Sequence, residues 1–578
     1  MSNSLFRRKS IEKILADAEK GYADHEGGGV KLNRALKVKD LTFLGIAAVI
    51  GTGVFTAIGS ASFHGGPAVI LLFTFTAIAC GFAAFCYAEF ASAVPVSGSA
   101  YTYSYIAFGE IFAWIIGWDL LMEYAIGNIA VAISWSQYFV RVLAGFDIHI
   151  PAWMTMDYVS AHTGFNDAAK QITGGKGLSS LDENLANAYN AWVHAPALGN
   201  FRIIMNVPAL LIVVLITYIV YIGIKESKKT NNILVLTKLG IIVLVIVAGA
   251  FYVSPGNWHP FMPNGFGGVM KGVSAVFFAY IGFDAISTTA EECQTPQRDL
   301  PRAMFNTLII CTVLYIILVL ILTGMTNYSK LNVADPLAFV FQDQHSKVGN
   351  WISGIVSVSA IVVIASVLLV YQLGQPRIWM SMSRDGLLPK VFSRIHPKYH
   401  TPSFSTVVTG FVVAVPALFL NLDVVLALTS IGTLFAFVLV CGGVLMLNSQ
   451  PQNKLYSKFK VPYLNGKYIV PVLFFACFGS ILYWGPGYFH ELMTSEGIPM
   501  MIFFVVATIV MVLTYIKNFS LIPVLGLLSC FYLMAQESFT NWARFVIWLV
   551  IGLTIYFSYG YKNSVVAKER RVVKLDKE

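Results

Sequence analysis

Charge is scarce in this chain of 578 residues, of which only 12% are charged and 57% are hydrophobic. Soluble domains carry about 25% charged residues. A chain this apolar cannot cover itself with polar groups in water, so we expect the lipid bilayer to be its solvent and partner. The net charge of +9 does not indicate a nucleic-acid partner, because the basic residues follow a membrane topology, as shown below.

Signals for other locations and folds are also missing. The first forty residues are polar and basic, and the first apolar run begins near Leu41, too late for a cleavable signal peptide. Alternating ten-residue strand patterns are absent, which argues against a barrel. No cysteines stand at metal or redox spacing, and we expect buried, small apolar roles for most of the seven: Cys80, Cys86, Cys293, Cys311, Cys441, Cys477 and Cys530.

Catalytic signatures are absent as well. The ten histidines lie mostly in tails and loops without paired ligand spacing, and the chain has neither a nucleophile elbow nor a phosphate-binding loop. We therefore predict that the protein is not an enzyme and that it holds no metal or cofactor.

Apolar runs of about 20 residues, the length that crosses about 30 Å of hydrocarbon, recur along the chain. We predict an all-α integral membrane protein of about fourteen spanning helices: 41–63, 67–94, 110–143, 203–223, 231–253, 268–291, 302–326, 349–382, 403–420, 424–447, 467–486, 499–516, 519–536 and 541–561.

The distribution of basic residues tests this count. With the N-terminus in the cytoplasm, thirty lysines and arginines fall in inside segments and six in outside segments. This asymmetry satisfies the positive-inside rule and predicts that both termini lie in the cytoplasm. We expect the membrane to be the plasma (inner) membrane.

The spans divide the chain into a predicted transport core and flanking parts. We expect a cytoplasmic N-terminal segment at 1–39, with a surface helix from Ile11 to Glu19. The remaining units are a core at 40–450 with an outside insert at 147–200, additional helices at 451–561, and a cytoplasmic tail at 562–578. The insert is too short and polar for a full domain, so we expect a cap with one or two short helices.

The first span contains the run Ile50-Gly51-Thr52-Gly53. Glycines in mid-span weaken a helix, and unwound backbone in a membrane is tolerated where it lines a cavity or is buried in protein. The freed amides of a half-helix form a site for a carboxylate. The alternative is that these small residues only allow tight helix packing.

The sixth span contains Gly282 and Asp284 in mid-span, between aromatic residues. A carboxylate inside a membrane is costly and by default indicates function. The alternative places Asp284 at the wetter end of a displaced helix. Breaks in the first and sixth spans occupy corresponding positions in two five-helix halves, which is typical of inverted-repeat transporters with a midplane site. A zwitterion suits such a site, with its carboxylate on amides and its ammonium on carbonyls.

Five motifs in order resemble those of the cationic amino acid transporter branch of the amino acid–polyamine–organocation superfamily. The five motifs are Gly45 to Phe55, Gly117 to Tyr124, Phe277 to Pro301, Ser383 to Pro389 and Ser430 to Leu434. The resemblance covers roughly residues 35–450, and a further match lies near 542–561.

The resemblance implies a LeuT-type core of two inverted five-helix repeats, with about four additional C-terminal helices. It implies a small-molecule substrate, an L-amino acid, whose carboxylate meets the amides of Gly51, Thr52 and Gly53. The amino group would meet carbonyls near the breaks, Phe278 would close over the substrate, and the eighth span would line the side-chain pocket. The residues assigned in this way, beside the three amides, are Ile50, Phe278, Ala279, Tyr280, Ile281 and Ser366.

Lys238 stands about two turns into the fifth span, roughly 10 Å deep. A lysine at this depth must pair, snorkel to the interface or lose its proton, because burial disfavours its charged form. The resemblance to proton-coupled relatives identifies Lys238 as the proton carrier that contacts the broken first helix. The alternative is a snorkelling lysine near the inner interface.

Asp119 and Glu123 are four residues apart and share a face of the third span. We favour structural pairing with a lysine or arginine. Glu123 and Asp284 are also candidates for binding a basic substrate side chain or a proton.

We therefore predict a secondary active transporter that imports cationic or broad-range L-amino acids by proton symport and works as a monomer. The alternatives are an amino acid exchanger, or a non-transporting sensor of the same fold.

Overall fold

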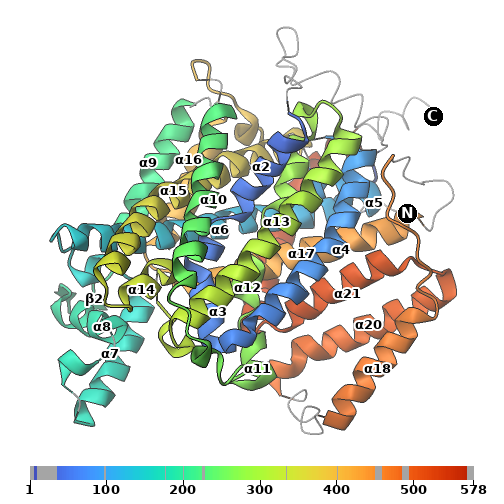
Figure 1. The fold of residues 1–578 in the computed structure, drawn as a ribbon. Helices are drawn as coiled ribbons and strands as arrows, with labels where there is room; N and C mark the ends of the chain where they lie inside the picture. The colour runs from blue at the N-terminus through green and yellow to red at the C-terminus, as the bar shows by residue number, and fades with distance from the viewer. Residues whose placement is uncertain are drawn as a thin grey trace, which may run out of the picture.

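Helices make up nearly all of the regular structure in the computed structural model of the protein (Figure 1). It describes residues 6–9, 36–96, 99–175, 177–181, 183–199, 201–223, 228–333, 335–399, 401–448, 458–484 and 494–568. Within these ranges the strands form a single two-stranded antiparallel ribbon of β1 (Ala197–Leu198) and β2 (Phe201–Arg202).

The α-helices have the following bounds: α2 Val38–Val49, α3 Ile58–Gly65, α4 Val69–Ala93, α5 Ser99–Ala107, α6 Glu110–Gly145, α7 Tyr158–Thr173, α8 Glu183–His194, α9 Val207–Ile222, α10 Lys228–Ala250, α11 Gly265–Met270, α12 Val273–Phe278, α13 Pro296–Met325, α14 Pro336–Gln342, α15 Lys347–Arg384, α16 Ser403–Ala417, α17 Leu422–Asn448, α18 Ile469–Trp484, α20 Ile498–Lys517, α21 Leu521–Ala535, α22 Phe539–Ile555 and α23 Tyr561–Asn563. Two further helical segments matter for the site, namely the π-helix η1 (Gly53–Ala57) and the 3₁₀ helix η6 (Phe283–Glu292).

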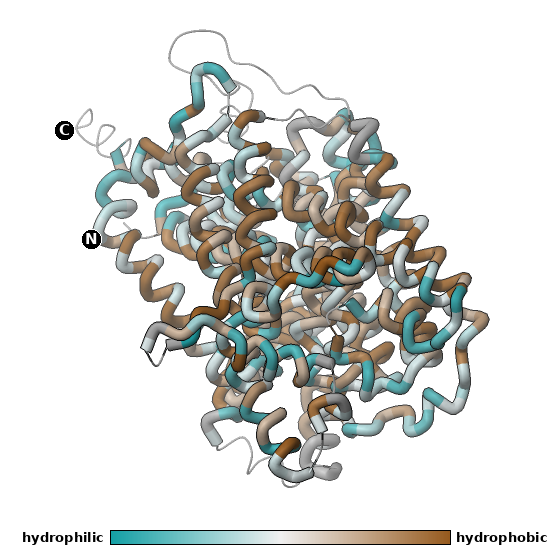
Figure 2. The backbone as a smooth tube through the Cα atoms, turned by 90° about the vertical axis from the view of Figure 1, so that its left-hand side faces the viewer, coloured by the Kyte–Doolittle hydropathy of each residue, from teal (hydrophilic) through white to brown (hydrophobic). Residues whose placement is uncertain are grey.

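Nine helical stretches within the described residues are long and apolar enough to cross a membrane, and four shorter apolar helices accompany them. Figure 2 shows hydrophobic residues along much of the bundle, with many hydrophilic stretches in the connections. One of the nine, Gly53–Ala93, joins parts of two predicted spans, because a short 3₁₀ helix at Gly66–Ala68 links α3 directly to α4. The chain is thus a multi-pass membrane protein, and the count of fourteen spans stays a prediction.

The centre of the bundle is built on α6, which packs along both α15 and α17, while α4 packs along α13. Small residues let these helices approach closely. A Cβ placed on Gly374 of α15 would lie 2.5 Å from the ring of Tyr124 on α6, so glycine is required there.

The predicted insert contains α7 and α8, in agreement with the expectation of one or two short helices. Asp157 caps α7 by accepting from the Ser160 amide (2.8 Å). The two helices and the segment that follows α8 share a small core of their own, made of Ala161, Ala191, Ala195 and Ile204. Figure 1 shows the insert beside one end of the bundle, toward which α3, α11 and α14 also lie; we call this the insert end.

Residues 6–9 bind beside the end of α15 and the start of α6. Lys9 Nζ pairs with Asp385 (2.6 Å), and the Tyr101 hydroxyl donates to the same carboxylate (2.6 Å). The Glu110 amide donates to the Arg7 carbonyl (2.8 Å). The predicted surface helix at 11–19 lies outside the described residues.

The C-terminal helix α22 is bonded to α6 through tryptophans. The Trp114 and Trp118 indoles each donate 2.9 Å hydrogen bonds, to the carbonyls of Gly552 and Trp548 respectively. The rings of Trp118 and Trp548 stack with centroids 4.5 Å apart. A Cβ on Gly552 would lie 2.3 Å from Trp118, so the absence of a side chain there allows this contact.

We predict that Gly552→Val destabilises the protein by about 1–3 kcal/mol, the usual range for overpacking a close contact. Thermal unfolding in detergent is the measurement. Gly81→Ala on α4 is the matched control, because a Cβ there meets nothing within 4 Å. Equal melting temperatures for Gly552→Val and the wild type would contradict the assigned packing.

Candidate functional site

The first predicted break is present between α2 and η1. Ile50 has an extended backbone (φ −78°, ψ 97°), and its amide still returns to Ile46 (2.9 Å). The next helical turn begins at Gly51, whose carbonyl accepts from the amides of Val54 and Phe55 (both 3.1 Å). The amides of Gly51, Thr52 and Gly53 therefore stand at the start of a half-helix, where amides have no intrahelical acceptor. We call residues 38–65 broken helix 1.

The second predicted break lies between α12 and η6. Gly282 has a φ of +114°, a conformation that residues with a side chain rarely adopt. A Cβ there would also lie 2.9 Å from that of Ala48. The turn before it includes Tyr280, whose amide returns to Phe277 (2.8 Å). We call residues 265–292 broken helix 6.

The two breaks touch each other. A Cβ on Gly53 would lie only 2.4 Å from the Cα of Ala279, so the backbones of the two broken helices are in direct contact. Phe278, Tyr280 and Ile281 are all at most 5% exposed. The structure thus brings the predicted residues of helices 1 and 6 into one buried region.

The carbonyls at the end of α2 lose their helical donors at the break, and side chains replace them. Lys238 Nζ donates to the Ala47 carbonyl (2.8 Å), and the Tyr315 hydroxyl donates to the Val49 carbonyl (3.1 Å). Buried carbonyls need such partners. The sequence alone gave no signal for Tyr315, which stands within an apolar run of α13.

Lys238 on α10 is only 1% exposed. This burial excludes the snorkelling alternative. Its ammonium lies at the C-terminal end of α2, where the helix dipole favours a positive charge. The predicted contact between Lys238 and the broken first helix is therefore present in the structure, while its role in proton coupling stays a prediction.

The carboxylates of α6 differ from our expectation. We favoured pairing of Asp119 and Glu123 with a lysine or arginine, but neither appears in an ion pair of the described residues. Both are buried, and both Asp119 oxygens lack a hydrogen-bond partner in this part of the chain. Their four-residue spacing does place them on one face, but that face meets Thr433 and Gly432 of α17 rather than a base.

Asp284 is 6% exposed and lies in the first turn of η6. Its carboxyl group lies close enough to that of Glu123 on α6 for the two to repel each other when both are ionised. The Ser287 hydroxyl donates to the Asp284 carbonyl (2.6 Å). The alternative in which Asp284 sits at a wet helix end does not fit this burial.

The eighth predicted span contributes Val367 at the first break. A Cβ on Gly51 would lie 3.0 Å from Val367. The neighbouring Ser366, which we had selected, is half-buried and bonds the Val363 carbonyl of its own helix (2.7 Å). The direct contact with helix 1 therefore comes from Val367, one position further along α15.

At the insert end, α14 closes over broken helix 1. Arg141 of α6 pairs with Asp335, which precedes α14, and donates to the side chain of Gln342, its last residue (2.5 Å). One guanidinium thereby holds both ends of this short helix. The Tyr138 hydroxyl donates to the Phe55 carbonyl in η1 (2.5 Å). None of these partnerships was predicted from the sequence.

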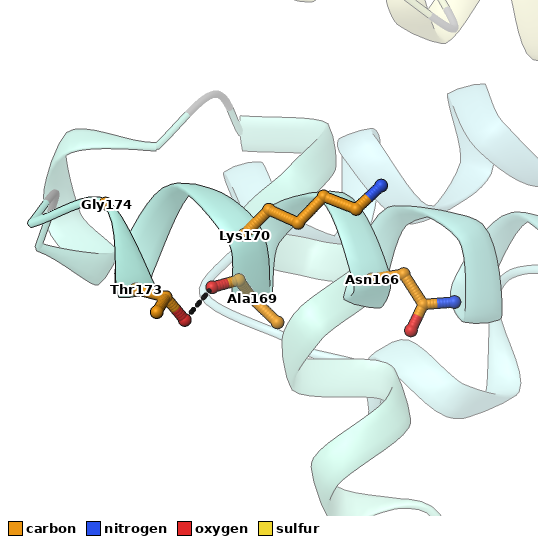
Figure 3. Close-up of a pocket in the computed structure, with 5 residues that line it drawn as sticks. All are labelled: Asn166, Ala169, Lys170, Thr173 and Gly174. Atoms are coloured by element: carbon orange, nitrogen blue, oxygen red, sulfur yellow. Dashed lines mark hydrogen bonds between the residues drawn. The ribbon is translucent and has the colours of Figure 1, made fainter.

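A shallow surface depression lies away from these residues, on α7 (Figure 3). It is lined by Asn166, Ala169, Lys170, Thr173 and Gly174. The Thr173 hydroxyl returns to the Ala169 carbonyl (2.7 Å), and Lys170 pairs with Asp167 (3.2 Å). The polar groups are thus satisfied within one helix, and the depression has no part in the buried site.

Comparison with known families agrees with this architecture. Residues 36–512 match the family model described as "Amino acid permease", and residues 520–564 match "C-terminus of AA_permease". The chain belongs to the amino acid permease family and is a cationic amino acid transporter-like member of the amino acid–polyamine–organocation superfamily. It is therefore a transporter rather than an enzyme.

Three relatives are similar over nearly the whole chain. A "Methylthioribose transporter" of Bacillus subtilis (strain 168) is 38% identical, over 98% of this chain and 100% of the relative. The "Branched-chain amino acid permease BcaP" of the same organism is 37% identical, over 98% and 99%. The "Cationic amino acid transporter 9, chloroplastic" of Arabidopsis thaliana is 32% identical, over 97% and 94%.

We predict that Gly53→Ala lowers transport by at least tenfold, because its new Cβ must separate the two breaks. Uptake into proteoliposomes, normalised to folded protein, is the measurement. Gly240→Ala on α10 is the control, since a Cβ there meets nothing within 4 Å. Wild-type uptake by Gly53→Ala would show that the close contact at Ala279 is not needed.

Proposed function

We propose that this protein is a secondary active transporter that imports L-amino acids together with protons by alternating access. Membership of the amino acid permease family supports amino acid transport. The observation that carries the site is the contact between two helix breaks, with helix-start amides at Gly51–Gly53 and a buried lysine at the end of α2.

A zwitterion fits the chemistry of the two breaks. The substrate carboxylate accepts from the amides of Gly51, Thr52 and Gly53, where the half-helix dipole also favours negative charge. The ammonium donates to carbonyls near Ile50 and along the turn Phe278–Ile281. Phe278 then covers the substrate, and Ser366 and Val367 face its side chain.

Lys238 couples this site to a proton. Its ammonium holds the last turn of α2 by charge and by the hydrogen bond to Ala47. Loss of the proton removes the charge and weakens the hold on that half of helix 1. The half-helix is then free to move, so protonation and alternating access depend on each other.

The proposed architecture is a LeuT-type pair of inverted five-helix repeats, extended to about fourteen spans by the C-terminal helices. We place the protein in the plasma membrane. The distribution of basic residues supports an orientation with both termini in the cytoplasm, which puts the insert end outside. We propose that the working unit is a monomer, with no cofactor other than the coupling proton.

The proposed site also bears on which substrate side chain the protein accepts. The names of the relatives point to branched-chain and cationic amino acids. Asp119, Glu123 and Asp284 supply buried carboxyl groups that would suit a basic side chain. A second candidate cargo is methylthioribose, favoured by the relative that is 38% identical. Exchange, or substrate sensing without transport, are the alternatives in mechanism.

We predict that at least one L-amino acid stabilises the purified protein, because a ligand that binds the folded state adds RT ln(1 + [L]/Kd) to its stability. A thermal-shift screen of the twenty amino acids and methylthioribose at two pH values is the measurement. Stabilisation by methylthioribose alone would overturn the proposed substrate class. Accumulation above equilibrium in vesicles then separates a transporter from a sensor.

We predict that Lys238→Ala abolishes uptake driven by a pH gradient but keeps measurable substrate exchange. The variant lacks the titratable group, while the amides and carbonyls of the breaks remain. The rate of gradient-driven uptake is measured in proteoliposomes with an imposed pH gradient. The rate of substrate exchange is measured by counterflow without a gradient. Thr237→Ala, beside Lys238 on the exposed face of α10, is the control. Undiminished gradient-driven uptake by Lys238→Ala would exclude the lysine as proton carrier.

A further inference from the structure

Glu537 stands in the short connection between α21 and α22, outside both helices, and is only 5% exposed. Burying a carboxylate is unfavourable unless polar groups compensate for lost water. No ion pair of the described residues includes it. Two neutral donors approach it instead, namely the Ser274 hydroxyl and the Asn541 side-chain amide (3.1 Å).

The first of these donors belongs to broken helix 6. Ser274 is the second residue of α12, and Phe278 is the last. Residues four apart lie on one helix face, one turn from each other. The hydrogen bond therefore connects the C-terminal region to the half-helix that carries the proposed lid over the substrate.

The Ser274 position is held from a second direction. The Ser430 hydroxyl of α17 donates to the Ser274 carbonyl (2.8 Å). The side chain of Ser274 is thus held by the α21–α22 connection, and its main chain by α17. The connection itself is ordered by the Trp542 indole, which donates to the Met534 carbonyl of α21 (3.0 Å).

We propose that Glu537 is a positioning residue of the transport site, whose carboxylate sets the place of α12, and through it of Phe278, by accepting from Ser274. This inference rests on the proposed function. It also gives the C-terminal helices a role in substrate binding, although none of the residues assigned to the substrate lies on them.

The hold depends on pH. Burial raises the pKa of Glu537 to about 7, against the smaller opposing effects of Ser274 and Asn541. The carboxyl is therefore protonated below about pH 7 and ionised above it. A hydrogen bond to an ionised acceptor is stronger than one between neutral groups, so α12 is held more firmly above pH 7.

Other titratable or charged groups on the elements around Glu537 can also contribute to the dependence of transport on pH. They come from the start of helix 6, the 3₁₀ turn η10 (Ser495–Gly497), α22, α17 and α3: Lys271, Glu496, Arg544, Asp423 and His64.

The test compares Glu537→Ala, Glu537→Gln, Ser274→Ala and the double variant Glu537→Ala/Ser274→Ala in the full chain. Glu496→Gln is the matched control, because Glu496 accepts from the Phe539 amide at the same end of α22 and has no hydrogen bond or ion pair with the described residues of helix 6. The rate of hydrogen exchange at the α12 amides reports directly how firmly α12 is fixed in place. Uptake of radiolabelled leucine or arginine, whichever the wild type accumulates, gives KM and kcat from pH 5.5 to 8.5.

We expect both single truncations to speed exchange in α12 and to raise KM about tenfold, as for loss of a hydrogen bond to a charged group. The double variant should show no faster exchange in α12 and no higher KM than either single variant. Glu537→Gln keeps a neutral acceptor for Ser274, so its KM should match that of the wild type at pH 5.5 but should lack the change in KM that the wild type shows as the pH rises through 7. Glu496→Gln should keep that change.

Unchanged α12 exchange in Ser274→Ala, losses that add in the double variant, or an intact change in KM through pH 7 in Glu537→Gln would each overturn the inference. Ser274→Ala removes a single hydroxyl, so the inference can be tested even if Glu537→Ala fails to fold. If the wild type accumulates neither probe, that result counts against the proposed function, and α12 exchange still decides whether Glu537 holds the half-helix.

Discussion

A peptide group that leaves a helix inside a membrane must find its hydrogen-bond partner within the protein, and the structure around the two breaks depends on this constraint. At the end of α2, a lysine and a tyrosine supply the donors that the helix no longer provides. On the other side of the break the amides of Gly51 to Gly53 start a new half-helix, and Gly53 lies against Ala279 of the second break. The proposed substrate completes the same set of partnerships, because its carboxylate is an acceptor and its ammonium is a donor.

Close packing turns two local breaks into one region. Gly53 meets the backbone of Ala279, and Gly282 meets Ala48, so each helix presses its glycine against the other. Because a packed contact between backbones cannot be compressed, the halves of helices 1 and 6 influence each other's positions. The elements around them extend this influence: Arg141 holds α14 over helix 1, and Glu537 reaches α12 from the C-terminal helices.

The parts of the site that could be predicted from sequence are those with a local signature. Glycines in mid-span reveal a break, and a lysine two turns into an apolar run reveals a buried charge. Partners far away in the chain leave no such trace. The residues near Lys238 do not indicate Ala47, which is 191 residues distant, and only the family resemblance led us to expect a contact with helix 1. Nothing near Ser274 indicates Glu537, which is 263 residues distant. The pairing expected for Asp119 and Glu123 is not seen among the described residues, because their spacing defines a shared face and not what packs against it. For the fold, hydropathy predicted where most of the apolar helices lie. It did not predict that α3 joins α4 directly, because that connection is a 3₁₀ turn of only three residues.

The partner of Lys238 is a main-chain oxygen, and this has a consequence for how the contact can vary among related proteins. Every amino acid carries a carbonyl, so no replacement at position 47 removes the acceptor. Substitutions at position 47 therefore leave the acceptor in place. The interaction changes only when residue 238 changes or when the backbone that positions the carbonyl moves. Two related chains could therefore share this contact while differing at position 47, and a comparison of side chains alone would not detect what they have in common.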